Sequence, residues 1–277
     1  MKKRFWLMGI AAALCSSAVA LSACSITTGM TYPNADKYTA GGATVTDAVT
    51  KLEIDWVDGS VDVAYGDVTG VTFSETSEAT LDTKETMHYW LENTTLHIKF
   101  AQSKRGISLN SYPEKALTVV LPAELQLTEL DITVVDASVA VENVAASDVE
   151  IETVDGEVNA YLVGTTRELS VATVGGDITV NADSVTEFEI ETVGAEVYLE
   201  SVTAPRSGSF EATGGSFTLA LYDDITGFTF EVEGLGGNFE SEFETTERGK
   251  SYVYGDGGNE YEAETVGGDV TVVKKTK

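Results

Sequence analysis

A repeating unit of 19 or 20 residues constrains this chain more than any other feature of its sequence. In the clearest run, between residues 130 and 199, consecutive units start 19 or 20 residues apart. The units are similar to VEIETVDGEVNA, and they start at Leu52, Leu130, Val149, Leu169, Phe188 and Tyr261, with degenerate copies at Phe210 and Phe230. A fixed period of this length is typical of a stack of equivalent structural units.

Each unit is a strand, a corner that contains glycine, and a second strand. Val, Thr, Ile and Tyr alternate with Asp and Glu, which is the period of half-buried strands, and no convincing amphipathic helix follows the tether. The body is therefore all-β. Two architectures fit: a β-solenoid whose rungs bend at the corner, or an antiparallel meander or sandwich of hairpins, because Asp-Gly and Gly-Gly also form two-residue turns.

The valine that precedes each corner favours the solenoid. In a hairpin meander, Val154, Val174, Val193 and Val266 would all point to water. If the chain bends instead, the side-chain phase can shift, and we expect Val154 to join Val158 inside. Eight or nine rungs stacked at about 4.8 Å would form a rod roughly 40 Å long.

Residues 64–129 interrupt the short period but keep the β pattern. Within 87–100, a turn at Asn93-Thr94 pairs Leu91 with Leu96 and Tyr89 with Ile98, which predicts a hairpin. Its polar face carries His88, Trp90 and His97. This face is a candidate ligand surface, because an aromatic ring beside polar groups can stack on a sugar. The alternative is a cross-strand aromatic pair that stiffens the hairpin.

The N-terminal sequence resembles a bacterial type II lipoprotein signal. A basic start, an apolar stretch and Leu21-Ser22-Ala23 precede Cys24, so we expect residues 1–23 to be removed and Cys24 to be lipidated, with palmitate among its lipids. An apolar run of about 18 residues could alternatively just span a membrane. Residues 24–44 then form a flexible tether, residues 45–273 one β-solenoid domain, and residues 274–277 a basic tail.

The charge balance excludes one class of partner. The chain has 17 Lys and Arg against 45 Asp and Glu, a formal net charge of -28. Nucleic acid is therefore not expected as a partner, because phosphate binding requires a cationic surface. In a solenoid, Glu157, Asp177 and Glu196 would be neighbours just after successive corners. They form a candidate calcium ladder, and the alternative is a solvated acidic face.

No catalytic pattern emerges from the remaining residues, and we expect neither enzymatic activity nor a cofactor. The chain has no Gly-x-Ser-x-Gly elbow, and both histidines lie on the one predicted hairpin. Cys15 leaves with the signal and Cys24 is lipidated, so no thiol remains for a disulfide, a zinc site or a nucleophile. The connection over 241–259 is longer than the others, and we expect it to cap one end of the solenoid.

Three segments and the recurrent ETVGG-type corners carry a resemblance to a known family. The segments are KLEIDWVDGSVDV at 51–63, LTVVLP at 117–122 and VYGDGGNEYEAETVGGDVTV at 253–272. Together with the corners they resemble the adhesin-like β-strand-repeat family of unknown function that occurs in bacterial surface lipoproteins. The resemblance covers about 45–273, and it implies a right-handed β-solenoid. It supplies no catalytic residues.

We therefore expect a non-catalytic lipoprotein on the extracytoplasmic face of the cell membrane, acting as an adhesin-like or structural interaction module. Its partners would be the membrane, through the lipid anchor, and an envelope protein or glycan. One alternative is a carbohydrate-binding or carbohydrate-acting β-helix protein. Another is an envelope stress or sensory lipoprotein that works with a membrane partner.

Overall fold

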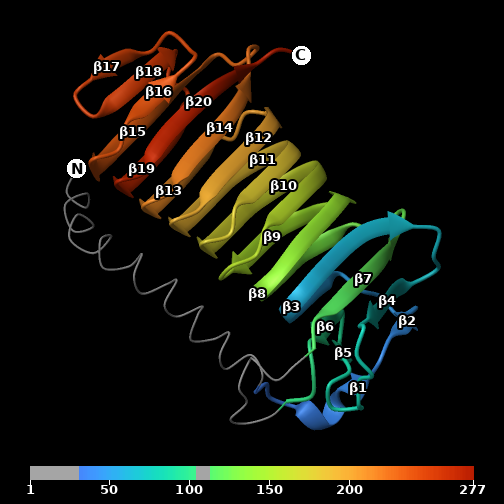
Figure 1. Cartoon of the computed structure of the whole chain (residues 1–277). Coiled ribbons are helices and arrows are strands. Elements are labelled where there is room, and N and C mark those ends of the chain that lie inside the picture. The colour runs from blue at the N-terminus through green and yellow to red at the C-terminus, as the bar shows by residue number, and fades with distance from the viewer. Residues whose placement is uncertain (1–30, 104–112) are drawn as a thin grey trace.

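The computed structural model describes residues 31–103 and 113–277, so the predicted lipidation residue Cys24 lies outside it. Within this part the chain forms a rod of stacked strands (Figure 1). The first face of the rod contains, in spatial order, β1 (Thr39–Ala40), β5 (His88–Glu92), β6 (Thr95–Lys99), the first half of β3 (Lys51–Gly66), the first half of β8 (Leu127–Val144), β9 (Ala146–Thr153), the second halves of β10 (Val158–Val174) and β11 (Ile178–Val193), β13 (Ser207–Thr213), β19 (Asn259–Val266), β15 (Gly227–Leu235), β18 (Ser251–Gly255) and β17 (Thr246–Arg248).

The second face is built from the other strand of each rung. It contains β2 (Ala43–Val45), β4 (Val71–Thr76), β7 (Lys115–Pro122), the second halves of β3 and β8, the first halves of β10 and β11, β12 (Glu196–Thr203), β14 (Ser216–Tyr222), β20 (Asp269–Lys275) and β16 (Phe239–Ser241). A short 3-10 helix, η1 (Ala35–Lys37), precedes β1.

The rungs pair in parallel, which decides between the two predicted architectures. In the pairing of β10 with β11, Leu169 lies beside Phe188 and Val171 beside Ile190, so equivalent positions of successive repeats are neighbours. A meander of hairpins would instead pair the two strands of one repeat with each other. The prediction of a β-solenoid is confirmed. The predicted hairpin of β5 and β6 is also present, with Leu91 opposite Leu96 and Tyr89 opposite Ile98.

The order of the rungs in space differs from their order in the chain at both ends of the rod. The first repeat, β3, lies between β6 and β7 on one side and β8 on the other. The last repeat, β19 and β20, lies between β13 and β14 on one side and β15 and β16 on the other. Both terminal repeats are therefore interior rungs.

Antiparallel strands cover the outer rungs. At one end β5 and β1 extend the first face while β4 and β2 extend the second. At the other end β18 and β17 pair antiparallel beside β15, so the connection over 241–259 lies where a cap was expected. Covering the edge strands in this way limits pairing with other chains.

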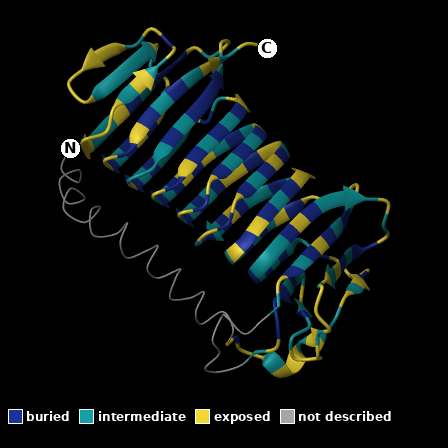
Figure 2. Cartoon of the chain, viewed as in Figure 1, coloured by how far each residue is buried: buried dark blue, intermediate teal, exposed yellow. Residues whose placement is uncertain are grey.

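One continuous apolar core fills the rod. Along each strand, buried and exposed residues alternate, and the buried bands line up from rung to rung (Figure 2). Leu130, Ile132 and Val134, for example, are fully buried and lie beside their counterparts in β9 and β3. The period of two in the sequence therefore sets which side chains face outward.

The corners are built differently from our prediction. Threonine, not valine, faces inward: the Thr173 hydroxyl is buried and donates to the carbonyl of Gly176 (3.0 Å), and the Thr153 hydroxyl accepts from the amide of Gly156 (3.0 Å). The next residue must then face outward, so the prediction that Val154 turns inside is wrong. Gly176 is required because a Cβ there would lie 2.1 Å from the carbonyl oxygen of Gly156 in the adjacent rung.

The predicted flexible tether is wrong for residues 32–44. Tyr32 is only 9% exposed, and its hydroxyl donates to the carbonyl of Ala101 (2.9 Å). Strand β1 pairs with β5, and β2 pairs with β4. The basic tail is likewise engaged, since Lys275 pairs with Glu200 and Lys277 with Asp224. Across 31–103 and 113–277, no helix is long and apolar enough to cross a membrane.

Candidate functional site

Carboxylates occupy most outward positions on the first face of the rod. Because side chains alternate along a strand and the rungs stack in register, the Glu-x-Glu sequences that precede several corners form columns along the rod, which serine, threonine or alanine interrupts on other rungs. We call this set the acidic face, and its members are Glu53, Asp55, Glu129, Asp131, Asp148, Glu150, Glu152, Glu168, Glu187, Glu189, Glu191, Glu211, Glu231, Glu233, Glu260, Glu262 and Glu264.

The second face is chemically different. Its outward positions are mostly threonine, serine, asparagine and tyrosine, so that Asn159, Thr179, Tyr198 and Thr218 lie side by side on successive rungs. Tyr161 is half exposed on the same face. The first face is therefore the more acidic of the two.

Crowding on the acidic face favours protonation of several carboxyl groups. Burial raises the pKa of Glu191, and the nearby carboxylates of Glu211 and Glu189 raise it further. Burial and neighbouring carboxylates likewise raise the pKa of Glu152 and of Glu264. These groups lie close enough to lose hydration and to repel one another, which makes their charged forms less favourable.

Cations of the chain itself neutralise the first rungs of the face. The Nζ of Lys99 lies between Glu53 (2.5 Å) and Asp55, and the Nδ1 of His97 lies 2.9 Å from Glu53. Burial alone would raise the pKa of Glu53, but the hydrogen bond with His97 and the charge of Lys99 lower it to about 2. Lys51 similarly pairs with Glu129.

Two further cations lie farther along the face. Arg167 contacts Asp148 (2.6 Å) and Glu168 (3.0 Å), which belong to neighbouring rungs. Near the opposite end, Lys250 pairs with Glu233 (2.5 Å). Ammonium and guanidinium groups thus bind carboxylates of the acidic face at ordinary ion-pair distances.

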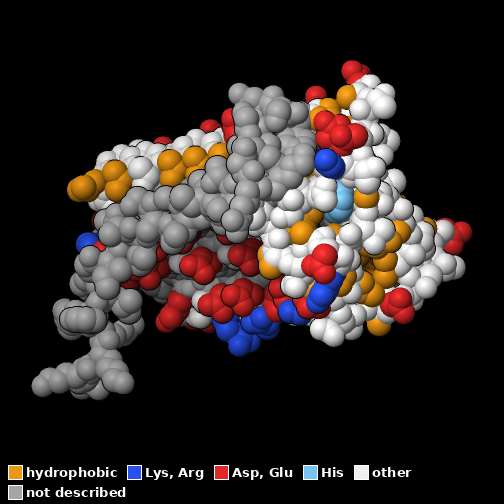
Figure 3. Space-filling view, turned by 90° about the horizontal axis from the view of Figure 1, so that it is seen from below, with side chains coloured by type: hydrophobic (Ala, Val, Ile, Leu, Met, Phe, Trp, Pro, Cys, Tyr) orange, Lys and Arg blue, Asp and Glu red, His pale blue; other side chains and the backbone are white. Residues whose placement is uncertain are grey.

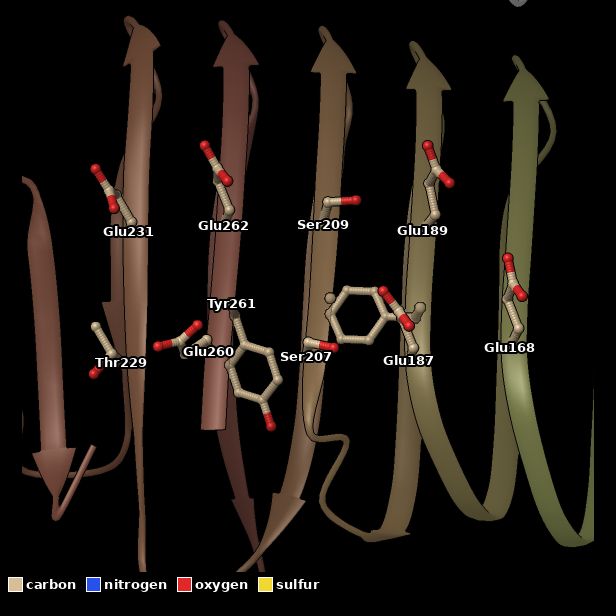
Figure 4. A pocket seen from close by; sticks show the side chains of 12 residues that line it. Glu168, Glu187, Glu189, Ser207, Ser209, Thr229, Glu231, Glu260, Tyr261 and Glu262 are labelled. Atoms are coloured by element: carbon tan, nitrogen blue, oxygen red, sulfur yellow. The ribbon is translucent and has the colours of Figure 1, made fainter. Parts of the chain in front are cut away.

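A hollow of about 400 Å³ opens in the acidic face over β13. There Ser207 and Ser209 replace the glutamates of the neighbouring rungs. Figure 4 shows Ser209 between Glu189 and Glu262, and Ser207 between Glu187 and Glu260. Gly208 lies between the two serines and leaves room for the ring of Phe188, because a Cβ at this position would lie 2.2 Å from that ring. The hollow therefore has acidic walls, and Phe188 and Tyr261 line it together with the two serines and Gly208.

A row of mostly apolar side chains, half-buried on the middle rungs and exposed near one end, borders the acidic face where the rungs turn. We call it the corner ridge, and its members on successive rungs are Val154, Val174, Val193, Thr213, Val266 and Leu235. Val266 is 52% exposed and Leu235 is 76% exposed. Figure 3, which views the rod from below, shows a row of hydrophobic side chains along one long edge and a cluster of carboxylates nearer the opposite edge.

The residues of the predicted calcium ladder lie side by side in the structure, and two of them accept hydrogen bonds within the chain. Glu157, Asp177 and Glu196 are exposed on adjacent rungs. A carboxylate oxygen of Asp177 accepts from the amide of Glu196 (3.0 Å), and Glu157 accepts from the Asn159 side chain (3.0 Å). Among the residues that the structure describes, no group of three or more His, Cys, Asp or Glu could hold a metal ion.

The predicted ligand face on the hairpin is partly covered. Trp90 and His97 are cross-strand partners and stack with their ring centroids 5.6 Å apart. The ring of Tyr38 packs edge-on against Trp90, and Lys37 Nζ lies 4.7 Å from its ring centroid. His88 is buried, with Nδ1 2.8 Å from the carbonyl of Thr86. The Trp90 ring is therefore packed against side chains of the chain itself, as in a cross-strand aromatic pair.

Sequence reasoning did not find the acidic face as a whole or the corner ridge. The signal was present: Glu-x-Glu precedes the ETV corner in several units, and the valine follows the buried threonine at the same phase as those glutamates. Because the corner valine was assigned to the interior, the valine and the glutamates were not recognised as facing outward together.

A family comparison covers most of the chain. The family model described as Toastrack DUF4097 matches residues 46–273, which is nearly the whole of the described body, and the chain belongs to this family. No curated protein matches the sequence.

Several solved structures show weak similarity. A "putative lipid binding protein" from Parabacteroides distasonis has a TM-score of 0.46 at 13% identity, with 85% of this chain and 96% of that chain covered. A "putative adhesin" from Bacteroides fragilis has a TM-score of 0.42 at 11% identity, covering 86% and 97% of the two chains. A "putative adhesin" from Parabacteroides distasonis has a TM-score of 0.40 at 17% identity, covering 86% and 97%. These similarities are too weak to indicate a shared function.

Proposed function

We propose that this member of the Toastrack DUF4097 family is a non-catalytic lipoprotein of the cell envelope. Cys24 carries the lipid anchor, and the solenoid is a rigid interaction module that contacts another macromolecule outside the cytoplasm. The observation that carries the proposal is the two-sided rod, which displays a periodic acidic face along its length.

The shape of this surface supports binding rather than chemistry. Enzyme sites generally bring a few convergent polar groups into a cleft that excludes water. Here the carboxylates instead recur over β8, β9, β11, β19 and β15, and serines take the equivalent position on β10 and β13. A repeated, extended array suits contact with an extended partner. Parallel rungs and buried corner threonines hold the array in place.

Metabolic labelling with an alkyne analogue of palmitate tests the anchor. The wild-type chain is expected to take up the label, and Cys24→Ala is expected to lose it and to leave the membrane fraction. Cys15→Ala is the matched control, because Cys15 lies in the segment that is removed, and it should keep the label. Labelling of Cys24→Ala at the wild-type level would contradict the proposal.

The non-catalytic part of the proposal has its own test. The purified chain is incubated with a panel of acidic and neutral polysaccharides, with calcium and with a chelator. No new reducing ends and no unsaturated products are expected. Calcium-dependent release of either product would show that the rod is a hydrolase or a lyase.

A further inference from the structure

We propose that the acidic face and the corner ridge together form one docking surface for a basic, amphipathic polypeptide segment that lies along the rod. The proposal rests on the proposed function only in placing this surface outside the cytoplasm. It adds the chemistry of the partner, which must present cationic side chains to the carboxylate columns and aliphatic side chains to the ridge.

The charge pattern carries the first half of the argument. Lys51 and Lys99 neutralise carboxylates of the first rungs, whereas Glu189, Glu262 and Glu264 farther along have no ion pair with a cation at a distance of 4 Å or less among the described residues. Burial and the neighbouring carboxylates raise the pKa of Glu262 and Glu264. A bound cation would relieve this repulsion, so these rungs are complementary to a positively charged partner.

Ion pairs within the chain show which cationic groups bind to the acidic face. Lys99 places its ammonium between two carboxylates of one strand, Glu53 and Asp55. Arg167 places its guanidinium between Asp148 and Glu168 on neighbouring rungs. The spacing along a strand and the spacing between rungs therefore both suit the side chains of lysine and arginine.

The hollow over β13 favours side chains over a metal ion. Glu187 and Glu260 face each other across Ser207, two rungs or about 10 Å apart. Calcium needs several oxygens at about 2.3–2.6 Å, which this spacing does not provide. A lysine or arginine side chain can enter such a hollow and leave both carboxylate walls close to its charge.

The corner ridge supplies the second, independent observation. Val154, Val174 and Val193 are half-buried, and Thr213 follows them on β13. Beyond it lie Val266 and Leu235, the most exposed apolar residues of the row. A small polyamine or a purely cationic chain would leave these side chains in water. A segment with aliphatic residues beside its cations would bury them, and burial of apolar area is favourable at about 25 cal/mol per Å².

The test measures binding of a defined probe to the purified full chain in phosphatidylcholine nanodiscs, with empty nanodiscs subtracted, and to the Cys24→Ala chain without a membrane, so that the result does not depend on the lipid anchor. The probe is an 18-residue peptide of lysine and leucine, with leucine at helical spacing of three and four, which spans about 27 Å as a helix. The matched probe has glutamine at every leucine position and the same charge.

Three variants separate the two halves of the surface. The acidic-face variant combines Glu189→Gln, Glu191→Gln, Glu262→Gln and Glu264→Gln. The ridge variant combines Leu235→Thr and Val266→Thr, a change that Thr213 already carries on the same ridge. The control variant combines Asp62→Asn and Glu142→Gln on the second face. Thermal melting of each variant checks that it folds.

The acidic-face variant is expected to weaken binding of the lysine-leucine peptide about tenfold. The ridge variant should weaken it about threefold or more, while binding of the lysine-glutamine peptide stays the same. The control variant should bind both peptides as the wild type does. Equal binding by the acidic-face variant, or equal weakening by the control, would overturn the docking surface.

Equal affinity for the two peptides would overturn the amphipathic partner. A failed palmitate experiment with intact peptide binding would refute the anchor and leave this surface standing. Palmitate labelling of Cys24 together with no effect of the acidic-face variant on peptide binding would refute the docking surface and leave the anchor standing.

Discussion

Burial within the stack of rungs raises the pKa of one carboxyl group, that of Asp131. It lies on β8 between Glu53 and Glu150 of the adjacent rungs. Burial raises its pKa to about 8, and the charges of Glu150 and Glu53 contribute after burial. An isolated aspartate has a pKa near 4, so the folded state binds this proton much more tightly than the unfolded chain does.

This difference predicts a pH dependence of stability. Between about pH 4 and pH 8 the folded state holds more protons at Asp131 than the unfolded state, so the free energy of unfolding falls as pH rises. Relative to Asp131→Asn, the wild type should lose on the order of 1–2 kcal/mol between pH 5 and pH 8. Urea unfolding of both proteins at several pH values measures the loss.

Comparison with Asp131→Asn isolates the effect from other groups. His88 works in the opposite direction, because burial lowers its pKa and its contribution decreases as the pH falls below its unfolded value. That contribution is common to both proteins. A constant difference in unfolding free energy across the range would show that Asp131 does not titrate as described.

The stability of the rod depends on the position of its last repeat. Strands β19 and β20 lie inside the stack and pair on both sides. Ala263, Val270 and Val272 are buried, and the Tyr261 hydroxyl donates to the carbonyl of Pro205 (2.7 Å). Removing this rung separates β15 and β16 from the rest of the core, whereas removing an end rung would only shorten the rod.

A chain that ends after Gly258 is therefore expected to lose far more than one rung. Loss of several fully buried side chains, at about 1.5–3 kcal/mol each, exceeds the stability of an ordinary domain in sum. We expect unfolding or aggregation in circular dichroism and gel filtration. A chain that ends after Lys275 retains β20 and is the control. Melting of the shorter chain near the wild-type temperature would contradict the interior position of β19 and β20.

At the scale of the whole molecule, negative charge is in large excess and crowds the first face of the rod. The formal net charge is -28, and the columns place carboxylates about 4.8 Å apart along the rod wherever the repeat is unbroken. The corner threonines and the continuous core oppose this repulsion. Screening by salt should therefore stabilise the rod.

The melting temperature is expected to rise by a few degrees between about 20 mM and about 500 mM sodium chloride. Calcium chloride at equal ionic strength should have the same effect as sodium chloride, because in the described part of the chain no carboxylate group is arranged to hold a metal ion. Differential scanning fluorimetry measures both series. A further increase with millimolar calcium would show that Glu157, Asp177 and Glu196, or another set, bind it.

The sequence by itself determined the all-β class, the rung length, the hairpin at 88–99 and the stacking of Glu157, Asp177 and Glu196. All of these follow from period-two alternation, from turn chemistry and from a repeat that places equivalent residues in register. Such signals are local or periodic, so they can be read along the chain.

Only the tertiary structure decided the phase at the corners, the interior position of the terminal repeats and the covering of Trp90 by Tyr38. Thr153 takes the inner position at its corner because its hydroxyl pairs with Gly156, and Val154 is thereby forced outward. The insertion of β3 and β19 depends on strand pairing between segments far apart in the chain. Because the repeats are similar in sequence, each could pair in parallel with several others. The packing of the whole rod therefore decides which repeats become neighbours.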